Sequence, residues 1–121
     1  MPFVIRIHQT GGPEVMRWED VLVGDPAPGE ARVRHEAVGL NYIDTYFRSG
    51  LYPMPLPSGL GMEGAGVVEA VGGGVTEYAP GQRVGVPWLG WTCGHCRYCT
   101  SGRENLCDAA RFTGYQIDGG Y

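Results

Sequence analysis

All four cysteines of the chain lie within fifteen residues, at Cys93, Cys96, Cys99 and Cys107. Two residues separate each of the first three, a spacing at which a tight turn points neighbouring sulfurs toward one ion. Four thiolates complete a tetrahedral shell, so the pattern predicts one zinc ion per chain that stabilises a loop and takes no part in chemistry. The ferredoxin-type cysteine run is the nearest rival, but it has a shorter last gap, and a proline follows its last cysteine where this chain has Asp108.

Two disulfides are the ordinary alternative for four cysteines. The first residues, from Met1 to Ile7, have neither the basic start nor the long apolar run of a secretion signal. We therefore expect a cytoplasmic protein. In a reducing cytosol, cysteines at this spacing favour a metal over disulfides.

The length of 121 residues suits a single domain with its own core, and we expect the cysteines to form a lobe at about residues 88–111. The net charge is −4, and the nine basic residues are all arginines spread thinly along the chain. These charges argue against binding to nucleic acid or to an anionic membrane. No apolar stretch approaches the length of a membrane span.

Short alternating runs, separated by many of the 21 glycines and 9 prolines, predict a turn-rich β domain. The predicted strands are residues 3–8 and 16–23, which form a hairpin around Gly11-Gly12-Pro13, and then residues 31–37, 64–71 and 83–87. Residues 114–121 predict the start of another strand. His35 falls on the inward side of its strand, where we expect a hydrogen-bonded core residue and not a ligand.

Residues 41–49 change period, because Ile43, Tyr46 and Phe47 recur at helical spacing and Gly50 can cap the end of a helix. Residues 51–60 contain three prolines and predict an ordered loop. Together the segments predict a mostly-β fold: a partly open β-barrel with one short helix and a structural-zinc lobe on one side.

Three segments resemble the N-terminal, GroES-like catalytic domain of the medium-chain dehydrogenase/reductase superfamily: Gly39-Leu-Asn-Tyr-Ile-Asp-Thr-Tyr46, Gly59 to Gly72, and Pro80-Gly-Gln-Arg-Val84. The resemblance covers essentially the whole chain but divides near Val84–Val86. Residues 1–84 resemble quinone oxidoreductases, and residues 85–121 resemble zinc-dependent alcohol dehydrogenases. This division suggests an engineered or recombined chimera, and a natural member with mixed features is the alternative.

The resemblance to alcohol dehydrogenases implies a catalytic zinc, held by a cysteine at the position of Asn41 and a histidine at that of Met62. An amide oxygen and a thioether are poor zinc ligands at neutral pH. Asp44 and Glu63 remain from that site, but two carboxylates alone do not recreate it. We therefore expect the catalytic zinc to be absent.

The resemblance to quinone oxidoreductases implies a metal-free cleft lined by Asn41, Tyr46 and Tyr52, in which hydride passes from NADPH to a quinone or enone. A helix cap and tyrosines with their hydroxyls in water are the simpler roles for these residues. The superfamily binds NADPH on a Rossmann domain. Gly72-Gly-Gly74 lies in a hairpin without a βαβ unit, so we expect that domain to be absent and the isolated chain to be inactive.

Three functions therefore stay open: a quinone-reductase-like catalytic domain with a small-molecule cleft, a truncated zinc-dependent alcohol dehydrogenase, and a non-enzymatic zinc-binding scaffold. A zinc-ribbon-like adaptor for protein or nucleic acid is a less favoured function, because the negative charges of Glu104 and Asp108 offset the positive charges of the lobe's arginines. Trp88, Leu89 and Trp91 suggest either packing of the lobe onto the barrel, which we expect, or a surface for homo-oligomer formation.

Overall fold

The structure is a computed structural model that describes residues 2–121. Its strands are β1 (Phe3–Ile7), β2 (Met16–Asp20), β3 (Ala31–Val38), β4 (Ser58–Gly59), β5 (Gly64–Val71), β6 (Arg83–Val86), β7 (Leu89–Trp91) and β8 (Arg111–Phe112). The structure has the helix α1 (Tyr42–Ser49). It also has three separate 3-10 turns, η1 (Pro13–Val15), η2 (Cys99–Ser101) and η3 (Glu104–Leu106). None of these helices is long and apolar enough to cross a membrane.

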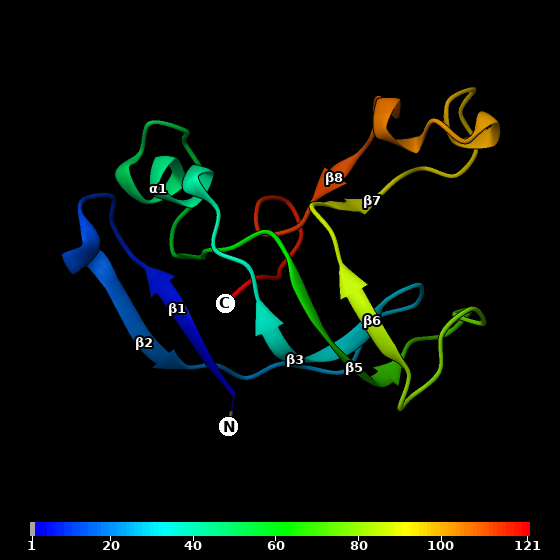
Figure 1. Cartoon of the computed structure of the whole chain (residues 1–121), viewed down its shortest axis with the longest axis horizontal. Helices are drawn as coiled ribbons and strands as arrows, with labels where there is room; N and C mark the ends of the chain where they lie inside the picture. Colours follow the sequence, from blue (N-terminus) through cyan, green and yellow to red (C-terminus); the bar gives the residue numbers. More distant parts are fainter. Residues whose placement is uncertain (1) are drawn as a thin grey trace.

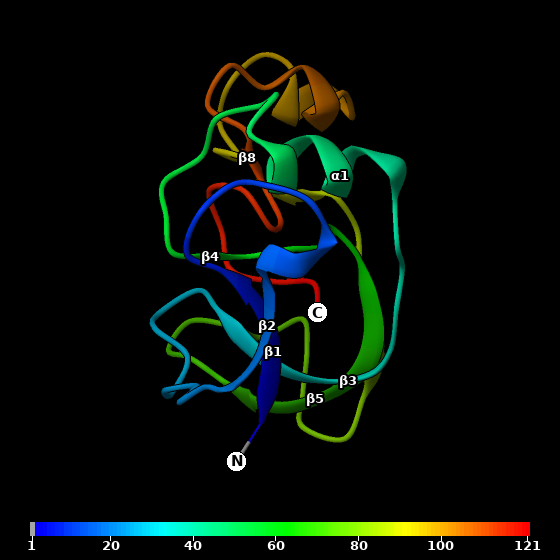
Figure 2. The ribbon, with the colours of Figure 1, turned by 90° about the vertical axis from the view of Figure 1, so that its left-hand side faces the viewer.

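The strands form three antiparallel sheets, with the orders β2-β1-β4, β3-β5-β6 and β7-β8. Figure 1 shows the β1–β2 hairpin and α1 on one side, the second sheet in the middle, and the segment from β7 to β8 projecting on the other side. The turned view in Figure 2 shows α1 above the hairpin. The sheets do not close into one barrel within residues 2–121, so the predicted mostly-β, partly open fold is confirmed.

The predicted opening hairpin is also confirmed, with Phe3 opposite Asp20 and Ile7 opposite Met16. The notable feature of the connection around Gly11-Gly12-Pro13 is that Pro13 begins the 3-10 turn η1, because its fixed φ suits a first helical position.

The main core joins the hairpin to α1. The buried members are Ile7, Val15, Phe47, Leu60 and Met62. The helix contributes through one face, because Phe47 and the partly buried Ile43 are four residues apart. It begins after Asn41 and ends at Gly50, whose φ of 87° lies in the left-handed region that favours glycine, so the predicted helix and its cap are confirmed.

The second sheet brings two backbones unusually close. A Cβ atom on Gly66 would lie 2.1 Å from the carbonyl oxygen of Arg34 on β3, so only glycine fits there. His35 packs its ring against Gly64, where a Cβ atom would lie 2.6 Å from Nδ1. That nitrogen is buried and has no hydrogen-bond partner among the described residues, so the hydrogen bond expected of His35 is not formed at Nδ1.

Residues 114–121 do not form the predicted strand. The short strand β8 precedes them, and both Gly114 and Gly120 have a φ of 79°, which an extended strand does not allow. The segment turns back instead, and the N–H of Tyr121 donates to the carbonyl oxygen of Leu60 at 3.0 Å. An alternating pattern of residues does not reveal that the chain turns back, because Tyr121 and its partner Leu60 are 61 positions apart in the sequence.

Candidate functional site

The cysteine lobe brings its four sulfurs together. The Sγ atoms of Cys93, Cys96, Cys99 and Cys107 all lie within 4.8 Å of one another. They are the only group of three or more Cys, His, Asp or Glu side chains in residues 2–121 arranged to share an ion. Gly94 and Gly102, with φ values of 77° and 74°, allow the two tight turns that aim these side chains inward.

Backbone N–H groups point at the same sulfurs. The N–H of Cys96 donates to Sγ of Cys93 at 3.3 Å, and the N–H of Cys93 donates to Sγ of Cys107 at 3.5 Å. Hydrogen bonds from the backbone of His95 and Cys96 lower the pKa of the Cys93 thiol to about 6. Loss of contact with water raises the pKa of the Cys99 thiol to about 11.

This set of donors fits a structural zinc ion. All four donors are sulfur, they converge from one short segment, and together they leave no coordination position open. The sulfurs of Cys93 and Cys99 are 3.9 Å apart, far from the roughly 2.05 Å of a disulfide bond. The four residues would hold the ion, and the ion would supply folding energy and no reaction chemistry. Ligation of zinc by these cysteines stays a prediction.

The tryptophans of the lobe pack against residues of the short strand β8. Trp88 and Trp91 are 48% and 45% exposed. The ring of Trp88 lies with its centroid 4.4 Å from that of Phe112, and the guanidinium of Arg111 lies 5.1 Å over the ring of Trp91. Both partners belong to β8, so the two rings pack across the β7–β8 ribbon and stay about half exposed.

A second group of candidate residues gathers at the start of α1. Asn41 is the residue that caps the helix, and its N–H donates to Oδ2 of Asp44 at 3.0 Å. Asp44 is only 3% exposed, although it is an acidic residue. The hydroxyl of Tyr121 donates to the same Oδ2 at 2.9 Å. Sequence reasoning missed this role of Tyr121, because nothing in its local pattern indicates a partner so far away in the chain.

An aromatic cluster adjoins this helix, and its members are Tyr42, Tyr46, Phe47, Tyr52 and Tyr115. The rings of Tyr46 and Tyr52, two of the predicted cleft residues, meet edge to face with centroids 5.3 Å apart. Tyr42 contacts Tyr46 at 5.5 Å, and Phe47 contacts Tyr115 at 5.5 Å. The four-residue spacing from Tyr42 to Tyr46 on a helix could have revealed the first of these additions. No sequence signal reveals Tyr115.

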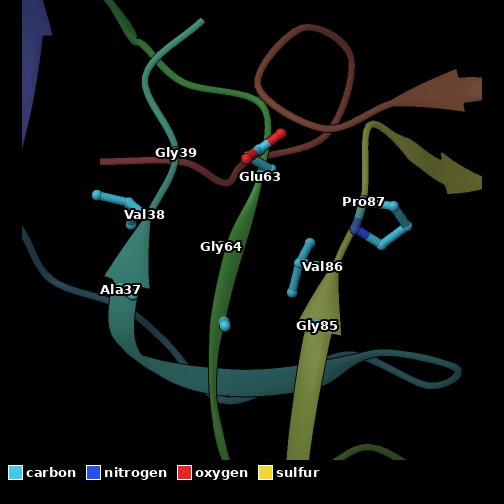
Figure 3. A pocket seen from close by; sticks show the side chains of 9 residues that line it. Ala37, Val38, Gly39, Glu63, Gly64, Gly85, Val86 and Pro87 are labelled. Atoms are coloured by element: carbon cyan, nitrogen blue, oxygen red, sulfur yellow. The ribbon is translucent and has the colours of Figure 1, made fainter.

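A surface hollow of about 570 Å³ lies at one end of the second sheet (Figure 3). It is lined by Ala37, Val38, Gly39, Glu63, Gly64, Ala65, Gly85, Val86 and Pro87. The side chain of Glu63 lies over Gly39, where any Cβ atom would clash with its carboxylate. The hollow does not include Asn41, Tyr46 or Tyr52. It reaches Gly39, two residues before Asn41, and therefore ends beside the start of α1.

Met62, at the other half of the expected empty zinc site, is 5% exposed and belongs to the main core. Its thioether packs among Phe47 and Leu60, so it serves as an apolar side chain. Asp44 binds Asn41 and Tyr121 through one oxygen. That the Asn41 and Met62 positions hold no zinc stays a prediction.

Comparison with known proteins identifies the family. Residues 27–121 match the alcohol dehydrogenase GroES-like domain. The chain belongs to this family. The GroES-like domain is the N-terminal catalytic domain of medium-chain dehydrogenases/reductases, so the resemblance to that superfamily is confirmed.

Its relatives fall into two groups. A quinone oxidoreductase of Pseudomonas aeruginosa is 63% identical over 81 residues, which cover 66% of this chain and 25% of that protein. The solved structure of Escherichia coli quinone oxidoreductase in complex with NADPH is 47% identical and has a TM-score of 0.69. The match covers 75% of this chain and 27% of that protein. A cobalt- and zinc-bound thermostable alcohol dehydrogenase from Pyrobaculum aerophilum is 32% identical, with a TM-score of 0.88 over 98% of this chain and 36% of its own.

The GroES-like domain described here thus spans about a quarter to a third of the length of the relatives it matches. The quinone oxidoreductases are more similar in sequence but match a shorter part of the chain. The alcohol dehydrogenase matches nearly all of it. Both quinone oxidoreductases and alcohol dehydrogenases therefore match this one domain, as the two resemblances in the sequence predict.

Proposed function

We propose that the GroES-like domain forms the substrate side of a quinone-reductase-type oxidoreductase, which transfers hydride from NADPH to a quinone or enone. The observation that supports this most is the environment of Asn41. Asn41 caps α1 and follows Gly39, which lines the hollow, by two positions in the sequence. It directly precedes Tyr42, a member of the cluster that contains Tyr46 and Tyr52. The high identity to a quinone oxidoreductase over 81 residues favours the same function.

The proposed roles follow from the chemistry of these side chains. The amide of Asn41 would donate a hydrogen bond to a carbonyl oxygen of the substrate, which gains negative charge as the ring is reduced. Tyr46 and Tyr52 would offer aromatic edges and faces to a planar ring. Their proposed task is to orient the substrate and exclude water.

We propose that NADPH binds outside these residues. All strand pairs in the three sheets of residues 2–121 are antiparallel, whereas a Rossmann site needs parallel strands joined through a helix. The N–H of Val75 donates to the carbonyl oxygen of Gly72 at 3.4 Å, so this glycine run is part of a turn. We therefore propose that a separate nucleotide-binding domain supplies the hydride donor.

The first test measures ligand binding by the zinc-loaded chain. Duroquinone is a suitable probe, because its four methyl groups block addition of cysteine thiols to the ring. We expect NMR shifts at the side-chain amide of Asn41 and the rings of Tyr46 and Tyr52. Asn41→Ala should weaken binding about fivefold, the equivalent of one hydrogen bond of about 1 kcal/mol. The matched control is Asn105→Ala, which removes an exposed amide from the cysteine lobe.

Turnover gives the second test. The isolated chain should not oxidise NADPH in the presence of duroquinone, whereas a fusion to a Rossmann domain should. Quinone shifts confined to the cysteine lobe, or equal binding by Asn41→Ala, would contradict the proposal.

The second candidate function is a zinc-stabilised scaffold without enzymatic activity, and the convergence of four sulfurs within 4.8 Å favours it. It predicts that chelation lowers the melting temperature, as the first proposal also does. The probe separates the two, because a scaffold has no reason to bind duroquinone at Asn41.

A further inference from the structure

Tyr121 connects the C-terminal segment to the start of α1. Its hydroxyl donates to Oδ2 of Asp44, which lies 77 positions earlier in the chain. The same oxygen accepts the N–H of Asn41. One carboxylate oxygen therefore binds both the residue that caps the helix and a side chain from a distant segment.

The carboxylate depends on these two bonds. Asp44 is 3% exposed, and its other oxygen, Oδ1, is buried without a hydrogen-bond partner among residues 2–121. A buried carboxylate is unfavourable unless its oxygens accept hydrogen bonds. The bonds to Oδ2 therefore fix its orientation, and loss of the bond from Tyr121 would leave only the N–H of Asn41 to hold it.

Tyr121 is itself held firmly. Its ring packs against Gly61, where a Cβ atom would lie 2.6 Å from the ring and where φ is 94°. Its N–H binds the carbonyl oxygen of Leu60, and its side chain packs against the main core. Burial raises the pKa of the Tyr121 hydroxyl well above its usual range, and the hydrogen bond to Asp44 raises it further. The hydroxyl therefore remains a donor at neutral and moderately alkaline pH.

We propose that Tyr121 is a positioning residue that acts through Asp44 to fix Asn41 at the proposed substrate site. The inference rests on the proposed function in one respect, that Asn41 contacts the substrate. Tyr121 need not touch the substrate, because it acts on the carboxylate that holds the backbone of Asn41. The residues of the two resemblances meet in this contact, since Asn41 and Asp44 belong to residues 1–84 and Tyr121 to residues 85–121.

The variant that tests this is Tyr121→Phe, which keeps the ring against Gly61 and removes only the hydroxyl. Tyr78→Phe is the matched control, because it removes the hydroxyl of a tyrosine that is 48% exposed and lies outside the aromatic cluster. Amide hydrogen exchange, measured by NMR, reads the local effect at Asn41. The amide of Val68, a residue that is 2% exposed in the second sheet, reports on global opening.

We expect the Asn41 amide to exchange about tenfold faster in Tyr121→Phe, which is the effect of losing one hydrogen bond to a charged group. Val68 should not change, and Tyr78→Phe should behave like the unmodified chain. An unchanged Asn41 amide would overturn the proposal. Equal acceleration at Asn41 and Val68 would also overturn it, because it would reveal a general loss of stability.

Duroquinone affinity separates this inference from the proposed function. If the unmodified chain binds the probe, Tyr121→Phe should raise its Kd about three- to tenfold, with a changed shift at the Asn41 side-chain amide. Faster exchange with unchanged affinity would show that Tyr121 does not position the amide. If the unmodified chain fails to bind the probe while Asn41 exchange still responds, the proposed function fails and the link from Tyr121 to Asn41 stands.

Discussion

The cysteine lobe and the start of α1 are assembled in opposite ways. The four cysteines come from fifteen consecutive residues, and the turns among them suffice to bring the sulfurs within 4.8 Å. The other site combines α1 with Tyr52, whose ring meets that of Tyr46, and with Tyr121, whose hydroxyl reaches Asp44 from 77 positions away. These segments pack around the main core. The lobe can therefore lose its order while the main core stays intact. The site at α1 cannot, because its residues are held together by that core.

This difference matters for stability. A short loop loses little entropy on closing, so one ion is enough to order the lobe. The site at α1 depends instead on burial of Phe47, on Asp44 and on the returning segment. Changes in the two regions should therefore have effects that remain separate.

The largest effect should come from Cys107→Ser, which removes the one buried cysteine of the four. Structural zinc sites have apparent binding free energies of about 10–16 kcal/mol, and loss of one thiolate should abolish stoichiometric zinc binding. We expect metal analysis to show less than one zinc per chain and lobe amides to exchange rapidly. The α1 amides should stay protected, and Ser101→Ala, a control in the same lobe, should keep its zinc. Full zinc content in Cys107→Ser would contradict the predicted ligand set.

The next effect should come from Phe47→Ala. This side chain is 7% exposed and contacts both Tyr52 and Tyr115. Its removal should lower the free energy of unfolding by about 3–5 kcal/mol through loss of burial and the cavity it leaves. Urea unfolding at constant zinc measures this, with Phe3→Ala as a control at a side chain that is 52% exposed. Zinc stoichiometry should not change, and a coupled loss of zinc would refute the separation of the two regions.

Asp44→Ala should have an intermediate effect of about 2 kcal/mol, because it removes the acceptor for both Asn41 and Tyr121. The measurement is thermal unfolding together with the circular dichroism signal of the helix. An exposed carboxylate, Asp118, provides the control variant Asp118→Ala. A variant as stable as the unmodified chain would mean that the buried carboxylate contributes nothing to the start of α1.

Thr113→Val should have the smallest effect, about 1 kcal/mol. Thr113 is 2% exposed, and its hydroxyl donates to the carbonyl oxygen of Pro87 at 2.8 Å, where the chain passes from β6 to the lobe. The substitution keeps the shape of the side chain and leaves that carbonyl without the bond. Urea unfolding should record the loss with zinc content unchanged. Release of zinc would show that the junction, and not the cysteines alone, controls the lobe.

Local patterns predicted what local forces determine. The helix at residues 42–49 followed from the spacing of Ile43, Tyr46 and Phe47, and Gly50 marked its end. The convergence of the cysteines followed from their spacing. In each case the deciding contacts lie within a few residues along the chain.

Other features could not be predicted because they depend on distant partners. His35 packs against Gly64 without a hydrogen bond at Nδ1, which depends on how β3 and β5 align. The segment after Phe112 alternates like a strand but turns back toward Leu60. The bond from Tyr121 to Asp44 follows from that return, so the sequence indicated Asn41 as a site residue without indicating what holds it.

The bonds of Thr113 have a further consequence. Its N–H donates to the carbonyl oxygen of Trp88 at 2.8 Å, and its hydroxyl to that of Pro87, so the chain enters and leaves the lobe at the same place. A segment whose two ends lie side by side can be inserted or deleted with little disturbance to the rest of a fold. The lobe has the geometry of an exchangeable cassette. Recombination at this junction would transfer a complete zinc-binding unit from one protein to another and leave the site at Asn41 on the recipient.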